Sequence, residues 1–319
     1  MRIAFVGKGG SGKTTFSYLF AKFLSSKSLP VLVIDADINQ QLGKLLRLEE
    51  QVSQPLFERA EELKNFFRGE NLFIKSSDLM IKTTPPGRGS QLISFKKDFG
   101  FLNNFTVKSG SLYFADTGDF EDDDIGVKCY HSKTGLVEII LNHFIDNQDE
   151  YIIVDMTAGA DAFASGLFTK FDLTVFIAES TEQSLAVYRQ YEKYAHLYNV
   201  PLAVVVNKVE DSEDRLFAEK NIDNILAFFP RSIMVKKMER GEAIKINELE
   251  KDNQEVLEVI KDKLDERVKD WELFYKQSIY FHQKNCLSWA NDSLGKDLTE
   301  QIDPEFDLTQ EVSRMTAGY

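Results

Sequence analysis

The chain has 319 residues, of which 43% are hydrophobic and 28% are charged, and this balance is typical of a folded protein rather than a disordered one. Its 38 Lys and Arg against 51 Asp and Glu give a formal net charge of -13, which argues against nonspecific binding to nucleic acid or to an anionic membrane. Two cysteines cannot form a disulfide framework and favour a cytoplasmic location, and the lack of any run of about 18 apolar residues predicts that no segment crosses a membrane.

Short, β-rich apolar runs alternate with segments of helical periodicity along most of the chain. Runs that are apolar along their whole length are expected to be buried on both faces, as in a parallel sheet covered by helices. The expected strands are residues 2–6, 31–35, 151–155, 173–177, 202–207 and 225–229, and the expected helices include residues 14–24, 134–144, 181–198 and 212–220. The sequence therefore predicts an α/β fold with a doubly wound, mostly parallel sheet.

Two segments depart from this alternation. Residues 48–130 are charged and rich in Phe, and we interpret them as an insertion with short strands near residues 72–74, 79–83 and 112–115. From residue 249 the pattern becomes helical, with one apolar stripe that comprises Val256, Leu257, Ile260, Leu264, Val268, Trp271 and Phe274. We therefore expect one main α/β domain over residues 1–245 and, over residues 246–319, a helical extension with an acidic tail that is ordered where it lies on the main domain.

Residues 7–14 read GKGGSGKT and match the phosphate-loop pattern between a predicted strand and a predicted helix. Glycines let successive backbone N–H groups turn toward phosphate oxygens, and the helix N-terminus adds a partial positive charge. Lys13 is expected to reach the β- and γ-phosphates of ATP, and the Thr14 hydroxyl is expected to bind Mg²⁺. The expected nucleotide-binding residues of the loop are Gly9, Gly10, Ser11, Gly12, Lys13, Thr14 and Thr15.

Acidic and amide side chains follow later strands, at the edge where ligands of α/β sheets bind. Asp35 and Asp37 end one strand, and Asp155 ends another and is followed by a small turn that contains Gly159. A strand-end Asp can hold the hydration shell of Mg²⁺, and the Gly159 N–H can meet the γ-phosphate, although a single Asp can instead cap a helix. Asn207 ends a third strand, where it is either a reader of the adenine edge or a simple turn residue. Two strand-end acids together with a phosphate loop indicate a nucleotide hydrolase.

Three motifs together resemble the deviant-Walker ATPases of the partition, division-site, nitrogenase-iron-protein and metallocentre-insertion group. They are KGGSGKTT at residues 8–15, DADIN at residues 35–39 and DMTAG at residues 155–159, and the extra lysine early in the first motif is specific to that group. The resemblance covers about the first 245 residues and implies a P-loop NTPase fold and a Mg²⁺-dependent ATPase that forms a nucleotide-dependent homodimer. It implies that Lys8 crosses to the partner's phosphates in the role of an arginine finger. By the same resemblance, Asp37 would orient the attacking water, and Asp35 and Asp155 would support Mg²⁺.

Within this group, the second and third motifs are most similar to those of the ATPases that insert nickel into carbon monoxide dehydrogenase. Those relatives carry a Cys-x-Cys pair shortly before a helix, and their dimer brings both pairs together on one metal ion. Here the corresponding place holds Cys129 and His131, so two copies would offer a sulfur and nitrogen donor set that suits Zn²⁺ or Ni²⁺ at a dimer interface. The alternative is that Cys129 is a small buried hydrophobic residue and that His131 caps the helix expected from Thr134. His282 and Cys286 share a helix face but are only two ligands, which is a weak metal signal.

These observations leave three functions open. The leading one is an ATP-driven dimeric switch that acts on a protein client, with metallocentre assembly as the leading pathway. The second is a partition-type or positioning ATPase, for which Lys236, Lys237 and Arg240 form a local basic cluster that the net charge opposes. The third is a regulator that senses nucleotide without turnover and acts on a protein partner. The presence of Asp37 favours turnover.

Overall fold

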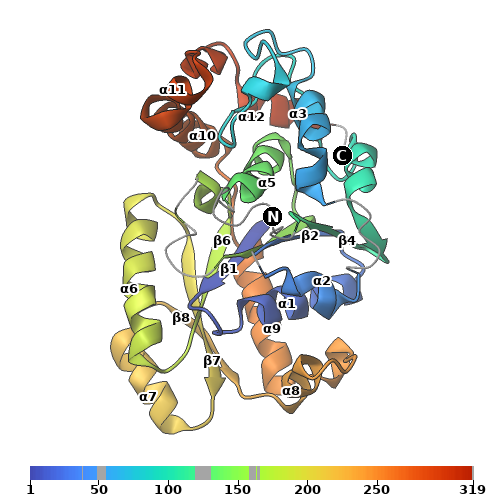
Figure 1. Cartoon of the computed structure of the whole chain (residues 1–319). Coiled ribbons are helices and arrows are strands. Elements are labelled where there is room, and N and C mark those ends of the chain that lie inside the picture. Colours follow the sequence, from blue (N-terminus) through green and yellow to red (C-terminus); the bar gives the residue numbers. More distant parts are fainter. Residues whose placement is uncertain (38, 49–54, 119–130, 158–162, 164–165, 318–319) are drawn as a thin grey trace.

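The computed structural model describes residues 1–319 except residue 38 and residues 49–54, 119–130, 158–162, 164–165 and 318–319. Its described strands form one eight-stranded sheet in the order β3-β4-β2-β5-β1-β6-β7-β8 (Figure 1). They are β1 (Arg2–Gly7), β2 (Val31–Ala36), β3 (Val107–Ser109), β4 (Leu112–Asp116), β5 (Tyr151–Met156), β6 (Leu173–Ala178), β7 (Leu202–Val209) and β8 (Ile225–Pro230). Every neighbouring pair is parallel except β3 and β4. The predicted doubly wound, mostly parallel sheet and its six main strands are confirmed.

Helices cover both faces of this sheet. Side chains of β1 alternate between the faces, so that Ala4 and Val6 join one buried cluster and Ile3 and Phe5 join the other. The first cluster includes side chains of α5 (His131–His143), α6 (Glu182–Leu197) and α7 (Ser212–Asn221), and the second includes those of α1 (Lys13–Ser26), α2 (Gln41–Leu46), α8 (Ile233–Glu239) and α9 (Lys251–Asp265) (Figure 1). Burial on both faces explains why the strands are apolar along their whole length.

Two of the three strands expected in the insertion do not form. Residues 72–74 and 80–83 lie in turns and irregular segments, Leu79 ends a short 3-10 helix, and Leu72 is 87% exposed. The Asn71 side chain accepts a hydrogen bond at 2.9 Å from the backbone N–H two residues later, and Thr84 accepts one at 3.0 Å from the N–H three residues earlier. The prediction was wrong because local side chains satisfy backbone groups that a sheet would otherwise pair.

The third strand expected in the insertion is confirmed as β4, which extends the main sheet beside β2. The unpredicted strand β3 pairs with β4 in antiparallel fashion across a turn at Gly110, whose φ is 64°. Two helices, α3 (Ala60–Arg68) and α4 (Phe99–Leu102), precede this hairpin. The insertion therefore contributes both to the sheet edge and to the layer that covers it.

The apolar stripe expected after residue 249 is divided between α9 and α10 (Trp271–Asn285). α9 buries its apolar side chains against the sheet, namely Val256, Leu257, Ile260 and Leu264. Phe274 of α10 lies in a separate cluster that includes α12 (Leu308–Thr316). The assignment of Val268 to the stripe was wrong, since this side chain is 88% exposed. The stripe divides because the Asp270 side chain accepts a hydrogen bond from the Leu273 N–H at 2.8 Å and so starts a new helix.

The acidic tail is held against the insertion. Arg88 Nε lies 2.7 Å from Asp303 Oδ2, and Gln301 Nε2 donates to the Leu79 carbonyl at 2.9 Å. Figure 1 shows α10, α11 (Asn291–Leu294) and α12 at the same end of the molecule as α3. The described part of the tail therefore lies on the insertion, and its order stays a prediction. None of the described helices is long and apolar enough to cross a membrane.

His143, at the end of α5, predicts a measurable acid sensitivity of the fold. Its Nδ1 lies 2.9 Å from the Ile139 carbonyl, its ring centroid is 5.0 Å from that of Phe67, and its Nε2 has no hydrogen-bond partner within the described ranges. Burial lowers the pKa of His143 to about 4, whereas the unfolded chain titrates near 6.5. The stability from neutral His143 is therefore complete above pH 6.5 and is lost as the pH falls toward 4.

We expect the free energy of unfolding of His143→Phe at pH 7 to lie within about 1 kcal/mol of that of the wild type. As the pH falls toward 4, the variant should lose on the order of 3 kcal/mol less stability than the wild type. Urea unfolding at neutral and mildly acidic pH measures both quantities. The exposed His196 provides the matched control, because His196→Phe should leave the pH dependence as it is. Equal acid sensitivity of His143→Phe and the wild type would contradict this account.

Candidate functional site

The glycine loop between β1 and α1 is closely packed against the ends of two other strands. Gly7, Gly10 and Gly12 have φ values of 149°, 80° and 107°, a region that residues with a side chain rarely adopt. A Cβ on Gly7 would lie 2.5 Å from the Ile177 carbonyl oxygen at the end of β6, and one on Gly12 would lie 2.4 Å from the Asn207 amide nitrogen of β7. The glycines thus allow the backbone to curl where no side chain fits.

Two residues from the end of β7 hold the loop in place. Asn207 Nδ2 donates to the Ser11 carbonyl at 2.7 Å, and Lys208 Nζ donates to the Gly10 carbonyl at 2.8 Å. Lys208 Nζ also pairs with Glu179 Oε1 at 2.6 Å. The support of the loop by Lys208 and Glu179 was not predicted from the sequence. The available signal was the position of this lysine directly after Asn207 at the end of a strand. Adenine recognition by Asn207 stays a prediction.

A pocket of about 470 Å³ opens beside the loop. Lys13, Thr14 and Thr15 at the start of α1 lie on one side of it, and Phe229 and Val235 lie among the residues on the other. Lys13 is 6% exposed, whereas Gly9 and Gly10 are exposed at the surface of the loop. The pocket therefore joins the phosphate loop to a wall in which Phe229 and Val235 lie beside charged side chains such as Arg231 and Lys236.

Asp35 and Asp155 lie opposite each other on the paired strands β2 and β5. Both are buried, and Asp155 Oδ1 accepts a hydrogen bond from Ser17 Oγ at 3.0 Å while its Oδ2 has no hydrogen-bond partner among the described residues. Burial raises the pKa of Asp155 to about 6, against the opposing effect of the Thr14 hydroxyl and the Lys13 charge. Burial, followed by repulsion from Asp155, likewise raises the pKa of Asp35.

These residues fit a hydrated Mg²⁺ ion. A buried carboxylate with one oxygen lacking a partner, next to the hydroxyl of Thr14, is a site that a hard cation and its water would stabilise. Among the residues that the structure describes, no group of three or more His, Cys, Asp or Glu could hold a metal ion. Phosphate oxygens and water would have to complete the coordination, which is usual for Mg²⁺.

Asp35 and its neighbours also position Asp37. The two carboxylate oxygens of Asp35 accept hydrogen bonds from the backbone N–H groups of Asp37 at 3.2 Å and Leu42 at 2.9 Å. Asp37 is 7% exposed, and its Oδ1 accepts from the Asn39 N–H at 2.9 Å and from Asn39 Nδ2 at 2.8 Å. Gln40 Nε2 donates to the Asp37 carbonyl at 2.8 Å. The spacing of Asp37 and Asn39, typical of an Asx turn, was the available signal for this arrangement.

Lys8 lies in the loop with its side chain partly exposed, and only its backbone carbonyl takes part in a described hydrogen bond, from the Ser11 N–H at 3.1 Å. Within the described part of the chain, the Lys8 ammonium has no ion pair. Gly159 and Cys129 lie outside the described residues, so their predicted contacts are not placed.

The helix that follows Cys129 begins at His131 rather than at Thr134, so His131 is the first residue of α5 and does not cap it from three residues away. The side chain of His131 is not among those described. At the other end of the chain, Cys286 Sγ lies 3.5 Å from His282 Nε2, which is also 3.0 Å from the Leu298 carbonyl oxygen. Burial raises the pKa of Cys286 to about 11 and lowers that of His282 to about 4. Cys286 and His282 are therefore buried against each other.

Known proteins with similar sequences include nucleotide-binding proteins. The family described as the CobQ/CobB/MinD/ParA nucleotide binding domain matches residues 3–254. An uncharacterized ATP-binding protein of Methanocaldococcus jannaschii is 27% identical over 223 residues, which are 69% of this chain and 79% of that protein. The carbon monoxide dehydrogenase accessory protein CooC of Rhodospirillum rubrum is 25% identical over 215 residues, which are 67% of this chain and 76% of CooC.

Solved structures show the same fold. The septum site-determining protein MinD of Pyrococcus horikoshii, complexed with Mg-ADP, superposes with a TM-score of 0.56 at 12% identity and covers 83% of this chain and 96% of its own. The MinC:MinD cell division protein complex of Aquifex aeolicus gives a TM-score of 0.53 at 19% identity, covering 84% of this chain and 97% of the matched chain. At these identities the likeness concerns the fold alone.

Proposed function

This chain belongs to the CobQ/CobB/MinD/ParA family of nucleotide-binding domains, and from that premise we propose that it is an ATP-hydrolysing homodimeric switch. The observation that carries the proposal is the meeting of the glycine loop with Asp155 at one edge of the sheet, where a buried carboxylate oxygen without a partner adjoins Lys13 and Thr14. That carboxylate would support the Mg²⁺ ion of a bound nucleotide, and during hydrolysis the same ion would stabilise the charge of the reacting phosphates.

In this proposal each residue of the site has a role. Lys13 and the loop N–H groups bind the phosphates, Thr14 and Asp155 hold Mg²⁺ partly through water, and Asp35 supports the same ion and orients the segment that carries Asp37. Asp37 accepts a proton from the attacking water, and the Gly159 N–H donates to the γ-phosphate. Mg²⁺, when bound, neutralises charge that develops on the phosphate oxygens. The nucleoside occupies the pocket against Phe229, beside Asn207 and Thr15.

We assign Lys8 to the active site of the partner subunit. Lys8→Ala should bind ATP within about threefold of the wild type, lose the ATP-dependent dimer and hydrolyse ATP at least about 100-fold more slowly, since a finger residue supplied in trans has an effect of this order. Light scattering with and without ATP measures the mass, and phosphate release measures turnover. Lys251→Ala, which removes an exposed lysine on α9, is the matched control. ATP-dependent dimerisation of Lys8→Ala would overturn the assignment.

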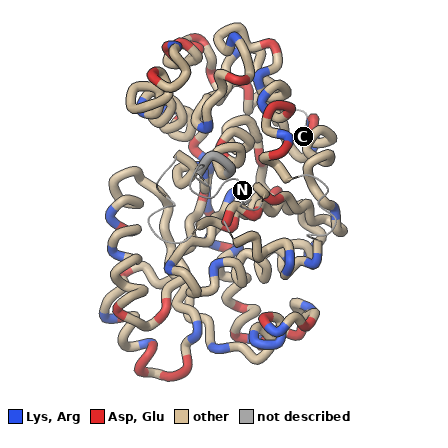
Figure 2. Tube along the Cα trace, in the orientation of Figure 1, with Lys and Arg blue, Asp and Glu red and all other residues tan. Residues whose placement is uncertain are grey.

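The proposed pathway is metallocentre assembly, with a protein client. It rests on the similarity to a carbon monoxide dehydrogenase accessory protein and on the pair Cys129 and His131. The basic cluster expected to serve a DNA-positioning ATPase gives that function less support, because Lys236 lines the nucleotide pocket and Lys and Arg are interspersed with Asp and Glu over most of the molecule (Figure 2). The remaining alternative is a sensor that binds ATP without hydrolysing it, and measurable ATP hydrolysis by the wild type would exclude it.

We expect the ATP-bound dimer of Asp37→Ala to take up one Zn²⁺ or Ni²⁺ ion per dimer, and the uptake to be lost on adding Cys129→Ser. Elemental analysis after gel filtration gives the stoichiometry. Cys286→Ser is the matched control, because that thiol is buried beside His282 and should not contribute. Uptake no greater than background, or uptake that Cys129→Ser leaves intact, would remove the metal assignment and leave a switch with a different client.

A further inference from the structure

The segment of the glycine loop that carries Lys8 is a tight turn. The Ser11 N–H donates to the Lys8 carbonyl oxygen at 3.1 Å and so closes a turn of four residues. Gly10, at the third position of this turn, has a φ of 80°, which is typical of a type II turn and suits glycine. The direction in which Lys8 leaves the loop therefore depends on the conformation of this turn.

Lys208 holds this turn from outside the loop, because its Nζ donates to the Gly10 carbonyl oxygen at 2.8 Å. The Gly10 carbonyl and the Ser11 N–H belong to one planar peptide unit, in which the two groups point in opposite directions. A hydrogen bond that fixes the carbonyl therefore also fixes the N–H that closes the turn on Lys8. Lys208 thus acts on Lys8 through a single intervening peptide unit.

The backbone of Lys208 adopts an unusual conformation at the end of β7. The pairing of β7 with β8 shifts register between Asn207 and Val209, and Lys208 between them has a φ of 61°. Residues other than glycine adopt such a φ rarely, and a bulge of this kind can redirect a side chain. The Lys208 N–H donates to Asn207 Oδ1 at 2.8 Å, which holds the irregularity in place. A conformation that costs energy is explained if the side chain that it directs is needed.

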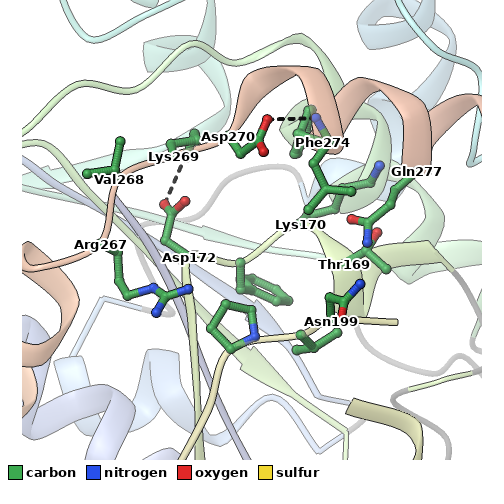
Figure 3. Close-up of a pocket in the computed structure, with 14 residues that line it drawn as sticks. Thr169, Lys170, Asp172, Asn199, Arg267, Val268, Lys269, Asp270, Phe274 and Gln277 are labelled. Carbon is green, nitrogen blue, oxygen red and sulfur yellow. Dashed lines mark hydrogen bonds and ion pairs between the residues drawn. The ribbon is translucent and has the colours of Figure 1, made fainter. Parts of the chain in front are cut away.

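Glu179 fixes the position of the Lys208 ammonium. Glu179 Oε1 lies 2.6 Å from Lys208 Nζ, and the two side chains are 18% and 39% exposed. Glu179 directly follows β6, and its backbone N–H donates to Ser184 Oγ at 2.9 Å. Just before the other end of β6, Asp172 pairs with Lys269 at 3.0 Å (Figure 3). The strand that leads to Glu179 is therefore held at both ends.

We infer, on the basis of the role proposed for Lys8, that Lys208 is a positioning residue that orients Lys8 for its crossing to the partner subunit. ATP binding should depend on Lys208 much less, because Asn207 Nδ2 separately holds the Ser11 carbonyl at 2.7 Å. Lys208 also lines the nucleotide pocket, so a direct contact with the nucleotide is the alternative role. A direct contact would show in ATP affinity, whereas positioning would show in the turn itself and in turnover.

The first test measures the turn in the nucleotide-free full chain. Lys208→Met removes the ammonium, and Lys208→Gly removes the whole side chain but suits the positive φ, so it should unfold at about the temperature of the wild type. In both variants the Ser11 amide should exchange with solvent at least about tenfold faster by NMR, because a charged hydrogen bond to its peptide unit is lost. Lys251→Met, which changes an exposed lysine on α9, is the matched control. Unchanged exchange in both Lys208 variants would overturn the positioning role.

The second test measures ATP affinity and turnover. Both variants should bind ATP within about threefold of the wild type and hydrolyse it at least about tenfold more slowly, since a displaced catalytic group is much less effective. Adding Lys208→Met to Lys8→Ala should cause no further loss, because Lys208 then has no ammonium to position. A further loss in this double variant, or an affinity for ATP reduced by more than about tenfold, would assign Lys208 to the nucleotide instead. Normal hydrolysis by Lys8→Ala alone would refute the role proposed for Lys8, and the Ser11 exchange rates would still show whether Lys208 fixes the turn.

Discussion

Lys13→Ala should abolish ATP binding, with a loss of affinity of at least about 100-fold. The Lys13 side chain is 6% exposed at the start of α1, so its charge faces the phosphates in a site largely shielded from water. The loop N–H groups cannot replace it, because they carry only partial charges and already serve the same phosphates. Titration with a fluorescent ATP analogue measures the affinity.

The control for this variant is Lys27→Ala, which removes an exposed lysine one residue beyond α1 that pairs with Glu258. It should bind ATP as the wild type does. Thermal unfolding of both variants without nucleotide shows whether the fold is retained. Wild-type affinity for ATP in Lys13→Ala would mean that the glycine loop is not the phosphate site.

Asp37→Ala should keep ATP binding and lose hydrolysis by at least about 100-fold, because positioned proton transfer contributes 100-fold or more to rates. The carboxylate is held by Asn39 beside the strand end that carries Asp35, and it is not part of the glycine loop. Without turnover the ATP-bound dimer should accumulate, and gel filtration with ATP should show it as the main species.

Asn39→Ala offers a graded comparison. It leaves the Asp37 carboxylate in place and removes one of its two hydrogen bonds from Asn39, so hydrolysis should fall less than in Asp37→Ala. Asp252→Ala, on the exposed first turn of α9, should hydrolyse ATP normally. Normal hydrolysis in Asp37→Ala would falsify the role assigned to that carboxylate.

The sheet and the main elements of the site could be predicted because strong local signals set them. Strands buried on both faces are apolar throughout, and in parallel neighbours such as β2 and β5 the equivalent ends meet at one edge. This register brings Asp35 and Asp155 opposite each other, as their positions after two apolar runs suggested. The close packing of the loop could also be predicted, because its glycines are typical of a backbone that leaves no room for a side chain. In the structure, Gly7 lies against Ile177 and Gly12 against Asn207.

Other features depend on contacts between distant residues, which periodicity does not reveal. Lys208 supports the loop through the Gly10 carbonyl, and its place directly after Asn207 does not by itself show which distant group it contacts. The helical pattern continued past Val268, but Asp270 starts a new helix there and Lys269 pairs with the distant Asp146 and Asp172. In the insertion, side chains such as Asn71 satisfy the backbone locally, and this competes with the β propensity of the neighbouring residues.

The most direct test of a dimeric ATPase completed by Lys8 is the dependence of turnover on protein concentration. ATP hydrolysis per chain would be measured with Mg²⁺ and saturating ATP over a range of concentration of about 100-fold. If each site needs Lys8 of a second copy, turnover per chain should rise with concentration and then level off as the dimer fills, and Lys8→Ala should show no rise. Constant turnover per chain from the lowest concentration, with the protein monomeric throughout, would contradict the account.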